Sequence, residues 1–251
     1  MGVSGAPLPL SALRAGAHRL GIPLTSGQVD AFSLYWDLLR EWNQRVNLTS
    51  AQALEEAERV HFLDSLTIAM AMPSEVREGG RLVDVGSGAG FPGLPLAIAF
   101  PSLGVVLIES VGKKVAFLRA CVEALGLEER VEVLHGRAEE LAHQPGLREG
   151  FSLGVARAVG PLAVALELVL PFVQVGGRAV FPKKGDWAGE VDLARPAAEA
   201  LGGAVPQVLE VDPSLLGPGR VLVVVPKVHP TPPRYPRRAG MPAKRPLGVS
   251  R

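Results

Sequence analysis

A glycine-dense turn that follows a short apolar run is the part of this sequence best suited to chemistry. The run covers residues 81–85, and three glycines at alternate positions, Gly86, Gly88 and Gly90, follow it directly. Glycine adopts positive φ at little cost and lets a ligand come close to the backbone. A strand, a tight turn and a helix N-terminus in this order are typical of α/β proteins that bind a nucleotide-like cofactor. The turn is therefore predicted to hold such a cofactor.

Glu109 and the glycine spacing narrow the choice of cofactor. Glu109 ends the next apolar run, and an acid at the tip of a second strand can accept hydrogen bonds from ribose hydroxyls. Dinucleotide enzymes share such an acid, but their G-x-G-x-x-G fingerprint needs glycine at position 91, which is Phe91 here. Asp84, just before the turn, suits a cofactor with a positive group. The pattern is similar to the first motif of S-adenosylmethionine-dependent methyltransferases.

The elements that position these residues alternate between strand and helix from residue 81 to residue 228. This alternation predicts a doubly wound, mostly parallel, Rossmann-like α/β sheet with helices on both faces. Only a turn at 213–219, with no helix, separates the last two strands, so they should pair antiparallel. The expected strands are 81–85, 104–109, 131–135, 151–157, 177–182, 205–211 and 220–226, and the expected helices are 92–100, 113–125, 137–143, 161–172 and 187–200.

The two ends of the chain differ from its middle. Residues 1–75 have a helical pattern, in which Thr25 and Gln28 form a capping box. The last residues are basic and rich in proline, and we expect an extended arm there rather than a helix or a central strand. The chain is therefore divided into an N-terminal helical region (1–75), a cofactor-binding methyltransferase domain (76–228) and a basic C-terminal arm (229–251).

The charge distribution favours a polyanionic partner. The net charge is +1, but all 25 acidic residues lie at or before Asp212, and residues 213–251 contain eight basic residues. An acid-free basic end on an acidic body is typical of nucleic-acid binding, although such an end is more often only a solvated terminus.

Cys121 is the single cysteine, which excludes a disulfide framework and fits a reducing cytoplasm. No apolar run reaches the roughly 20 residues of a membrane span.

Further motifs resemble those of the bacterial GidB family (glucose-inhibited division protein B, also called RsmG). The glycine turn that continues into Phe-Pro-Gly-Leu-Pro-Leu and the C-terminal tail are the specific parts, and Arg245 is a small departure at a position where a polar residue is common. The resemblance covers almost the whole chain after the first twenty residues. The matching stretches are 47–49, 61–66, 84–96, 109–110, 113–114, 117–118, 136–139, 157–159 and 234–247.

The resemblance implies an S-adenosylmethionine-dependent enzyme that methylates N7 of a guanine in 16S ribosomal RNA. It implies a seven-stranded class I methyltransferase sheet with an N-terminal helical cap. N7 has a lone pair and no proton to lose, so an in-line displacement depends on positioning and needs no general base. The expected partner is 16S ribosomal RNA or the small ribosomal subunit. We expect a cytoplasmic monomer that uses neither a metal nor a membrane.

The same resemblance assigns residues to the cofactor and the RNA. The glycine turn would hold the amino-acid and ribose parts of the cofactor, Glu109 the ribose, and Ala138 with Glu139 the adenine edge. First-turn helix charge is an equally good reading of Glu139 from the residues alone. The expected cofactor-binding residues are Asp84, Gly86, Ser87, Gly88, Gly90, Phe91, Glu109, Ser110, Ala138, Glu139 and Arg157. The RNA-binding candidates are Lys113, Lys114, Lys183, Lys184, Arg234, Arg237, Arg238, Lys244 and Arg245.

Arg157 is the candidate catalytic residue. It follows the apolar fourth strand, where strand ends line the ligand crevice, and an arginine in such a setting is costly unless it is paired. It can contact the cofactor carboxylate or donate to guanine O6. The alternative is a buried structural ion pair. For His61, a hydrogen-bonded helix histidine is favoured over catalysis.

Three other functions are consistent with parts of the sequence. The chain could be a small-molecule methyltransferase of the same fold, but the basic arm argues against it. It could be a nucleotide-binding dehydrogenase, but Phe91 argues against that. A binding module for RNA or ribosomes that keeps a cofactor pocket would be excluded by an observed methyl transfer. On the favoured interpretation, truncation before Arg234 should weaken RNA binding and leave cofactor binding largely intact.

Overall fold

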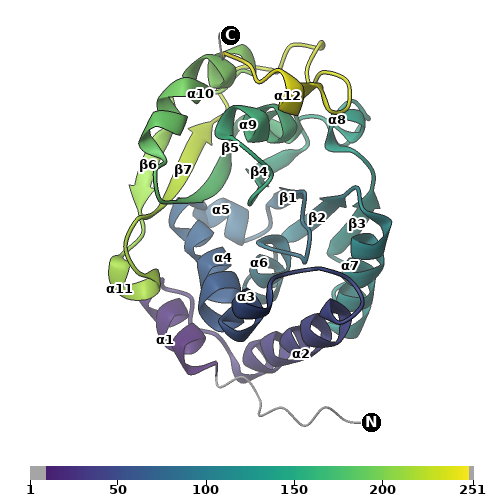
Figure 1. Ribbon diagram of the computed structural model, residues 1–251, viewed down its shortest axis with the longest axis vertical. Helices are drawn as coiled ribbons and strands as arrows, with labels where there is room; N and C mark the ends of the chain where they lie inside the picture. Colours follow the sequence, from purple (N-terminus) through teal and green to yellow (C-terminus); the bar gives the residue numbers. More distant parts are fainter. Residues whose placement is uncertain (1–9, 249–251) are drawn as a thin grey trace.

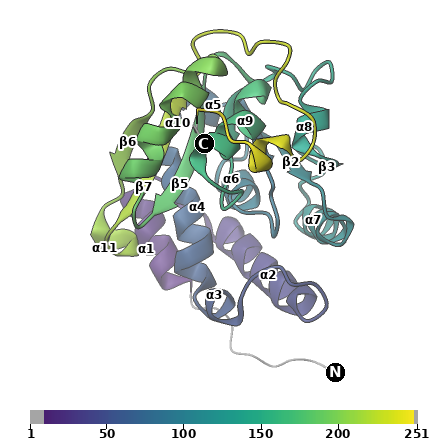
Figure 2. The ribbon, with the colours of Figure 1, turned by 45° about the horizontal axis from the view of Figure 1, so that its top comes forward.

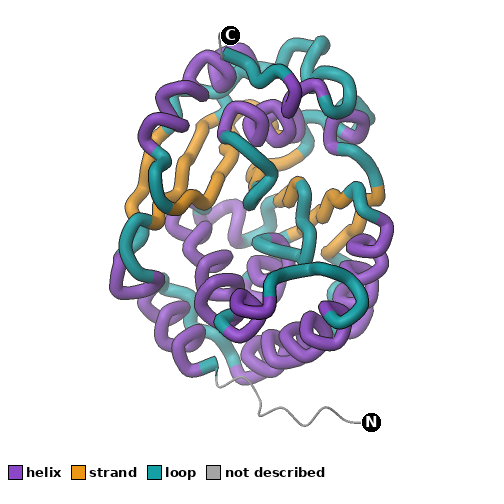
Figure 3. Tube along the Cα trace, viewed as in Figure 1, coloured by secondary structure: helices purple, strands orange, loops and turns teal. Residues whose placement is uncertain are grey.

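The computed structural model describes residues 10–248, which form one seven-stranded sheet between two layers of helices (Figures 1 and 3). The strand order is β3-β2-β1-β4-β5-β7-β6. Strand β7 is antiparallel to both of its neighbours, and the pairs between β3 and β5 are parallel. The strands are β1 (Arg81–Val85), β2 (Gly104–Glu109), β3 (Val131–His135), β4 (Phe151–Val155), β5 (Val173–Lys184), β6 (Gln207–Glu210) and β7 (Arg220–Pro226). The predicted mostly parallel sheet is confirmed.

One face of the sheet is covered by the N-terminal helices together with α6 and α7, and these elements share one apolar core with it (Figure 1). Helix α2 begins with the predicted capping box of Thr25 and Gln28. The helices of this layer are α1 (Ser11–Arg19), α2 (Ser26–Asn43), α3 (Ala51–Glu55), α4 (Asp64–Leu66), α5 (Ser74–Arg77), α6 (Gly93–Ala99) and α7 (Gly112–Ala124), with a π-helical turn (Glu58–Leu63) before α4 and a 3₁₀ helix (Thr67–Ala71) after it.

The opposite face carries a second apolar core beneath α8, α9 and α10. Figure 2 shows the last part of the chain passing α8 and then crossing α9 towards α10. Helix α10 is linked to β7 through β6 and α11. These elements are α8 (Ala138–Leu141), α9 (Leu162–Val169), a 3₁₀ turn (Leu170–Phe172), α10 (Ala188–Ala200), α11 (Pro213–Leu216) and α12 (Met241–Lys244).

Two details of the prediction were wrong. A short helix, α11, lies between the last two strands, which nevertheless pair antiparallel as expected. The C-terminal segment also contains a helix, α12, and folds back on the body instead of extending from it. Both helices carry a proline in their first turn, where the N–H that proline lacks would be unpaired in any case.

The predicted boundaries at residues 75 and 228 stay a prediction. The N-terminal helices share a core with one face of the sheet, and Tyr235 in the C-terminal segment belongs to the core on the other face. No helix within residues 10–248 combines the length and the apolar character that a membrane crossing requires.

Candidate active site

The candidate residues gather at one edge of the sheet. Parallel strands end at a common edge, and Glu109, Glu139 and Arg157 lie at or just after the ends of β2, β3 and β4. Because β7 runs in the opposite direction, its first residue, Arg220, pairs with Lys184, the last residue of β5. This edge is where open α/β sheets bind their ligands.

The glycine turn leaves its backbone bare on one side. Gly86, Gly88 and Gly90 all have positive φ, at 72°, 57° and 91°. A Cβ atom added at Gly86 would come within 2.6 Å of a methyl group of Val159, whereas one added at Gly88 would meet only a carbonyl oxygen, 3.8 Å away. The turn is tightly packed at Gly86 and open at Gly88, and the open position suits the close approach of a cofactor.

Tyr35 supports the same turn from α2. Its hydroxyl donates a hydrogen bond to the carbonyl of Ala89, and the side chain is fully buried. Burial raises the pKa of this hydroxyl well above its ordinary value, so it stays a donor. The N-terminal helices therefore do more than cover the sheet, because Tyr35 of α2 also holds the glycine turn in place.

Glu109 is fixed by two backbone donors. One carboxylate oxygen, Oε2, accepts the N–H of Gly88 at 2.9 Å, and Oε1 accepts the N–H of Val111 at 2.8 Å. The residue is 5% exposed. Each carboxylate oxygen can accept a second hydrogen bond. The group thus supports the turn and keeps acceptor capacity for ribose hydroxyls.

Asp84 lies beneath the turn and not at its surface. Its side chain is fully buried, and Oδ2 accepts the N–H of Gly93 at 2.9 Å. Oδ1 has no hydrogen-bond partner among the residues that the structure describes. Burial raises the pKa of Asp84 to about 7, although the hydrogen bond from Gly93 opposes the shift. An orphaned buried carboxylate oxygen under the glycine turn fits a cofactor that brings a positive group.

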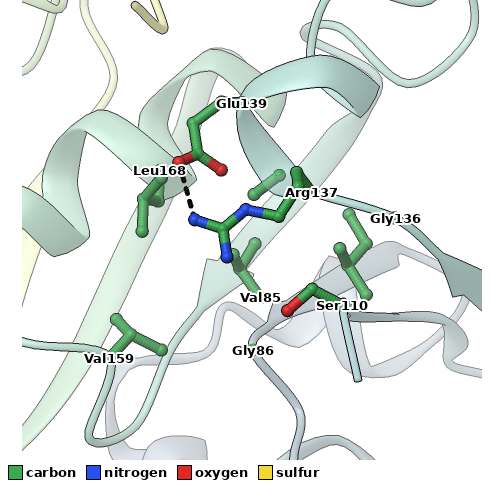
Figure 4. Close-up of a pocket in the computed structure, with 10 residues that line it drawn as sticks. Val85, Gly86, Ser110, Gly136, Arg137, Glu139, Val159 and Leu168 are labelled. Atoms are coloured by element: carbon green, nitrogen blue, oxygen red, sulfur yellow. Dashed lines mark hydrogen bonds and ion pairs between the residues drawn. The ribbon is translucent and has the colours of Figure 1, made fainter. Parts of the chain in front are cut away.

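A cavity of about 190 Å³ opens beside the glycine turn (Figure 4). Apolar side chains line it, and the guanidinium of Arg137 lies between them and forms an ion pair of 3.1 Å with Glu139. A cavity with apolar walls and a few convergent polar groups is suited to a purine ring. The lining residues are Val85, Gly86, Ile108, Ser110, Gly136, Arg137, Ala138, Glu139, Val159 and Leu168. Four predicted cofactor residues, Gly86, Ser110, Ala138 and Glu139, are among them.

Two predicted cofactor-binding residues, Ser87 and Phe91, are buried and contact other residues of the protein. Ser87 is buried, and its hydroxyl donates to the backbone carbonyl of Asp84 at 2.9 Å. Phe91 is 4% exposed and stacks on His61, with 4.4 Å between the ring centroids. Neither side chain lines the cavity, so the structure gives both a supporting position.

A second cavity of about 400 Å³ lies on the other side of Arg157. Its lining is strongly basic and includes the ends of β4 and β5 and the start of β7. Nε of Arg220 is buried there without a hydrogen-bond partner in the described part of the chain. The lining residues are Val60, His61, Asp64, Arg157, Ala158, Pro182, Lys183, Lys184 and Arg220. Such a cavity suits an anionic or acceptor-rich ligand.

Arg157 is held by three groups from the N-terminal cap. Its Nη1 donates to the carbonyl of Val60 and to Oδ2 of Asp64, both at 3.1 Å, and its Nη2 lies 3.0 Å from Nδ1 of His61. The guanidinium also lies 5.0 Å from the ring centroid of Phe91. Asp64 forms a second ion pair, with Arg220. The ion pair with Asp64 is therefore present, and the paired guanidinium also lines the cavity, so a catalytic role for Arg157 stays a prediction.

His61 has a defined protonation state. A guanidinium can only donate, so Nδ1 of His61 accepts from Arg157 and the ring proton is on Nε2, 2.8 Å from the hydroxyl of Thr49. Burial and the neighbouring Arg157 lower the pKa of His61 to about 4. The ring is therefore neutral at pH 7 and serves as an acceptor for Arg157.

The RNA-binding candidates are spread over two regions. Lys113, Lys114, Lys183 and Lys184 lie near the carboxyl edge, where Lys183 pairs with Glu190 at 2.7 Å and Lys184 is exposed. Arg234, Arg238, Lys244 and Arg245 are exposed on the C-terminal segment. Arg237 differs from them, because Glu167 occupies its guanidinium.

Sequence reasoning missed Asp64, Arg220 and Tyr35 as site residues. Asp64 stood within a matched motif, and its position three residues after His61 was the available signal. Arg220 carried no local signal, since its place depends on the direction of β7. No group of three or more His, Cys, Asp or Glu side chains within residues 10–248 is arranged to hold a metal ion.

The fold and the turn define the class of protein, a class I S-adenosylmethionine-dependent methyltransferase. A solved S-adenosylmethionine-dependent O-methyltransferase from Thermotoga maritima matches with a TM-score of 0.52 and 19% identity, over 79% of this chain and 72% of that one. A geranyl diphosphate methyltransferase matches with a TM-score of 0.55 and 14% identity, over 80% and 100% of the two chains. At such identities the likeness shows the fold alone.

The chain belongs to the GidB family, described as rRNA small subunit methyltransferase G, whose profile matches residues 28–212. A relative of that name from Dehalococcoides mccartyi is 44% identical over 232 residues, which cover 92% of this chain and 97% of the relative. Another, from Roseiflexus castenholzii, is 47% identical over 230 residues, or 90% and 95% of the two chains. The resemblance read from the sequence motifs is confirmed, and the cofactor is S-adenosylmethionine.

The Asp84→Asn variant is expected to be more stable than the wild type and to bind the cofactor more weakly. The folded protein keeps the Asp84 proton up to about pH 7, whereas the unfolded chain releases it near pH 4. The raised pKa therefore costs stability as the pH rises from about 4 to 7. The free energy of unfolding of the asparagine variant should exceed that of the wild type by roughly 1–3 kcal/mol at pH 8 and by almost nothing at pH 4.

Urea unfolding at both pH values measures this difference, and Asp37→Asn, at an exposed carboxylate, is the control. If Asp84 has the predicted role in cofactor binding, the same variant should bind S-adenosylmethionine about tenfold more weakly, because it lacks the carboxylate charge. An equal stability difference at pH 4 and pH 8 would contradict the raised pKa.

Proposed function

We propose that the protein transfers the methyl group of S-adenosylmethionine to N7 of a specific guanine in 16S ribosomal RNA. The observation that carries the proposal is the pair of cavities on either side of residues 157–159, at one edge of the sheet. One adjoins the cofactor turn, and the other is basic and open. Family membership supports the reaction and its substrate, since the relatives are named rRNA small subunit methyltransferase G.

The first cavity and the glycine turn are proposed to bind the cofactor. S-adenosylmethionine supplies an electrophilic methyl group on a sulfonium centre. Gly86, Gly88 and Gly90 would line its amino-acid and ribose parts, Glu109 would accept from the ribose, and Glu139 would lie at the adenine edge. Asp84 would act through the turn, as a buried negative charge opposite the amino group of the cofactor. These residues bind and orient, and orientation is the main requirement of an in-line displacement.

The second cavity is proposed to receive the target guanine. Arg157 would donate to O6, the acceptor next to N7, and thereby fix the orientation of the base. Two cap residues, His61 and Asp64, hold that guanidinium in place. Lys184 and Arg220 would contact phosphates beside the base. N7 loses no proton, so the neutral His61 has no proton to remove and acts only as an acceptor for Arg157.

We further propose that the protein acts as a monomer in the cytoplasm, without a bound metal ion. The reaction needs no Lewis acid, because the methyl donor is already activated. The single cysteine, Cys121, is fully buried in α7 and is suited to packing, not to nucleophilic attack.

A methyl-transfer assay tests the function. The protein is incubated with labelled S-adenosylmethionine and with undermodified small ribosomal subunits, or with their stripped RNA, and the digested RNA is analysed for modified nucleosides. We expect 7-methylguanosine at one site. Calorimetric binding of the cofactor without transfer to either form of RNA would instead support a small-molecule substrate or a binding module.

Lys184→Ala tests the basic cavity as an RNA contact. Loss of one phosphate contact should weaken RNA binding about three- to tenfold and lower the slope of log K against log salt by about one. Binding is measured by a salt titration with fluorescent RNA. Arg195→Ala removes an exposed charge from α10 and is the matched control. Equal effects of the two variants would argue against a specific contact at Lys184.

A further inference from the structure

The C-terminal segment is attached to the body by hydrogen bonds that its backbone carbonyls accept from side chains of the body, among them the half-buried Arg148. Arg148 donates to the carbonyl of Thr231 at 2.7 Å and to that of Tyr235 at 2.9 Å. His143 lies 3.0 Å from the carbonyl of Pro236, and Tyr235 is only 8% exposed. Figure 2 shows the segment crossing α9, and α12 contacts that helix. The segment therefore has one defined position above α8 and α9.

Glu139, which lines the cofactor cavity, depends on this segment. Its Oε1 accepts the backbone N–H of Gly240 at 2.9 Å as well as Nη2 of Arg137 at 3.1 Å. Figure 4 shows the Arg137 contact beside the cavity. Burial alone would raise the pKa of Glu139, but the hydrogen bonds from Gly240 and Arg137 outweigh burial and lower it. The carboxylate is thus kept charged in a position that the segment helps to set.

Glu167, on α9, depends on the segment even more. Its side chain is fully buried, and it accepts the backbone N–H and Nε of Arg237 at 2.9 and 2.8 Å, and Nη2 at 2.5 Å. The next residue, Leu168, lines the cofactor cavity. A buried carboxylate without its donors is strongly disfavoured, so loss of Arg237 would destabilise the present position of helix α9.

Two helices that wall the cofactor cavity, α8 and α9, therefore each place a buried carboxylate under the C-terminal segment. We propose that residues 234–245 position the wall of the cofactor pocket, with Arg237 acting through Glu167 and Gly240 acting through Glu139. This inference rests on the proposed cofactor site. It revises the expectation that truncation before Arg234 leaves cofactor binding intact, and it gives Arg237 a positioning role in place of an RNA contact.

The test is the affinity for S-adenosylhomocysteine, measured by calorimetry without RNA and well below the thermal midpoint of each variant. Arg237→Gln should bind at least tenfold more weakly than the wild type. Arg238→Gln is the matched control, because the neighbouring arginine is exposed on the same segment, and it should stay within twofold. Since no RNA is present, this result is independent of whether ribosomal RNA is the substrate.

A conservative variant keeps the proposal testable if Arg237→Gln does not fold. Arg237→Lys retains the charge opposite Glu167 but not the two-nitrogen fork, so it should fold and bind about threefold more weakly. In methyl transfer, both variants should raise the KM for S-adenosylmethionine and leave kcat within twofold. A folded Arg237→Gln protein with wild-type affinity, or an Arg237→Lys protein with wild-type affinity where the glutamine variant is unfolded, would overturn the proposal.

Discussion

Replacing Arg157 with alanine is expected to lower the rate of methyl transfer to ribosomal RNA by about two to three orders of magnitude. The guanidinium lines the cavity proposed for the guanine, and Asp64, His61 and the carbonyl of Val60 fix its orientation. A donor held in this way costs no reorganisation at the moment of reaction, and alanine removes it entirely. Affinity for S-adenosylmethionine should change little, because Arg157 does not line the cofactor cavity.

Single-turnover methylation with saturating cofactor measures the effect of this change. Arg178→Ala is the control, since Arg178 is another half-buried arginine of the sheet, donates to the carbonyl of Ala71 at 3.2 Å and lines neither cavity. A methylation rate within threefold of the wild type would show that Arg157 has no catalytic role. Equal losses of methylation rate in the two variants would show that Arg157 acts only as part of a structural ion pair.

Replacing Asp64 with alanine is expected to lower the free energy of unfolding by about 3–5 kcal/mol. Its side chain is 8% exposed and accepts from two arginines far apart in sequence, Arg157 just after β4 and Arg220 at the start of β7. Without the carboxylate, two guanidiniums stay side by side in a half-buried site with Lys183 nearby. The loss should include most of the methylation activity, because Arg157 also loses its orientation.

Urea unfolding followed by circular dichroism measures the stability of the Asp64 variant. Asp192→Ala removes an exposed ion pair with Arg195 and should cost no more than about 1 kcal/mol. If the two alanine variants are equally stable, the Asp64 cluster is solvated and its charges do not depend on one another.

The parts of the fold that the sequence predicts well are those with a local pattern. The strands β1, β2 and β4 are mostly apolar runs that are buried on both faces, and the glycines at 86, 88 and 90 take up positive φ in the tight turn. The helix α12 was missed because the proline signal that argues against a helix holds only beyond its first turn.

The unpredicted parts of the site depend on long-range packing. Asp64 meets Arg220 only because β7 runs antiparallel and starts at the edge where the other strands end. The neutral state of His61 depends on burial that its neighbours in sequence do not reveal. The hydrogen bonds of Glu139 and Glu167 to the C-terminal segment join residues 70 to 101 positions apart, and no local pattern in the sequence indicates them.

The C-terminal segment is synthesised last, so its contacts with the rest of the protein can form only at the end of synthesis. A chain is made from its N-terminus and its domains begin to fold as they emerge, so the glycine turn and all seven strands precede Arg237 and Gly240. A nascent chain that has completed its sheet still lacks the Gly240 donor to Glu139 and the Arg237 donors to Glu167. Loading with cofactor should therefore be delayed until those last residues have left the ribosome, and partial chains should not sequester S-adenosylmethionine.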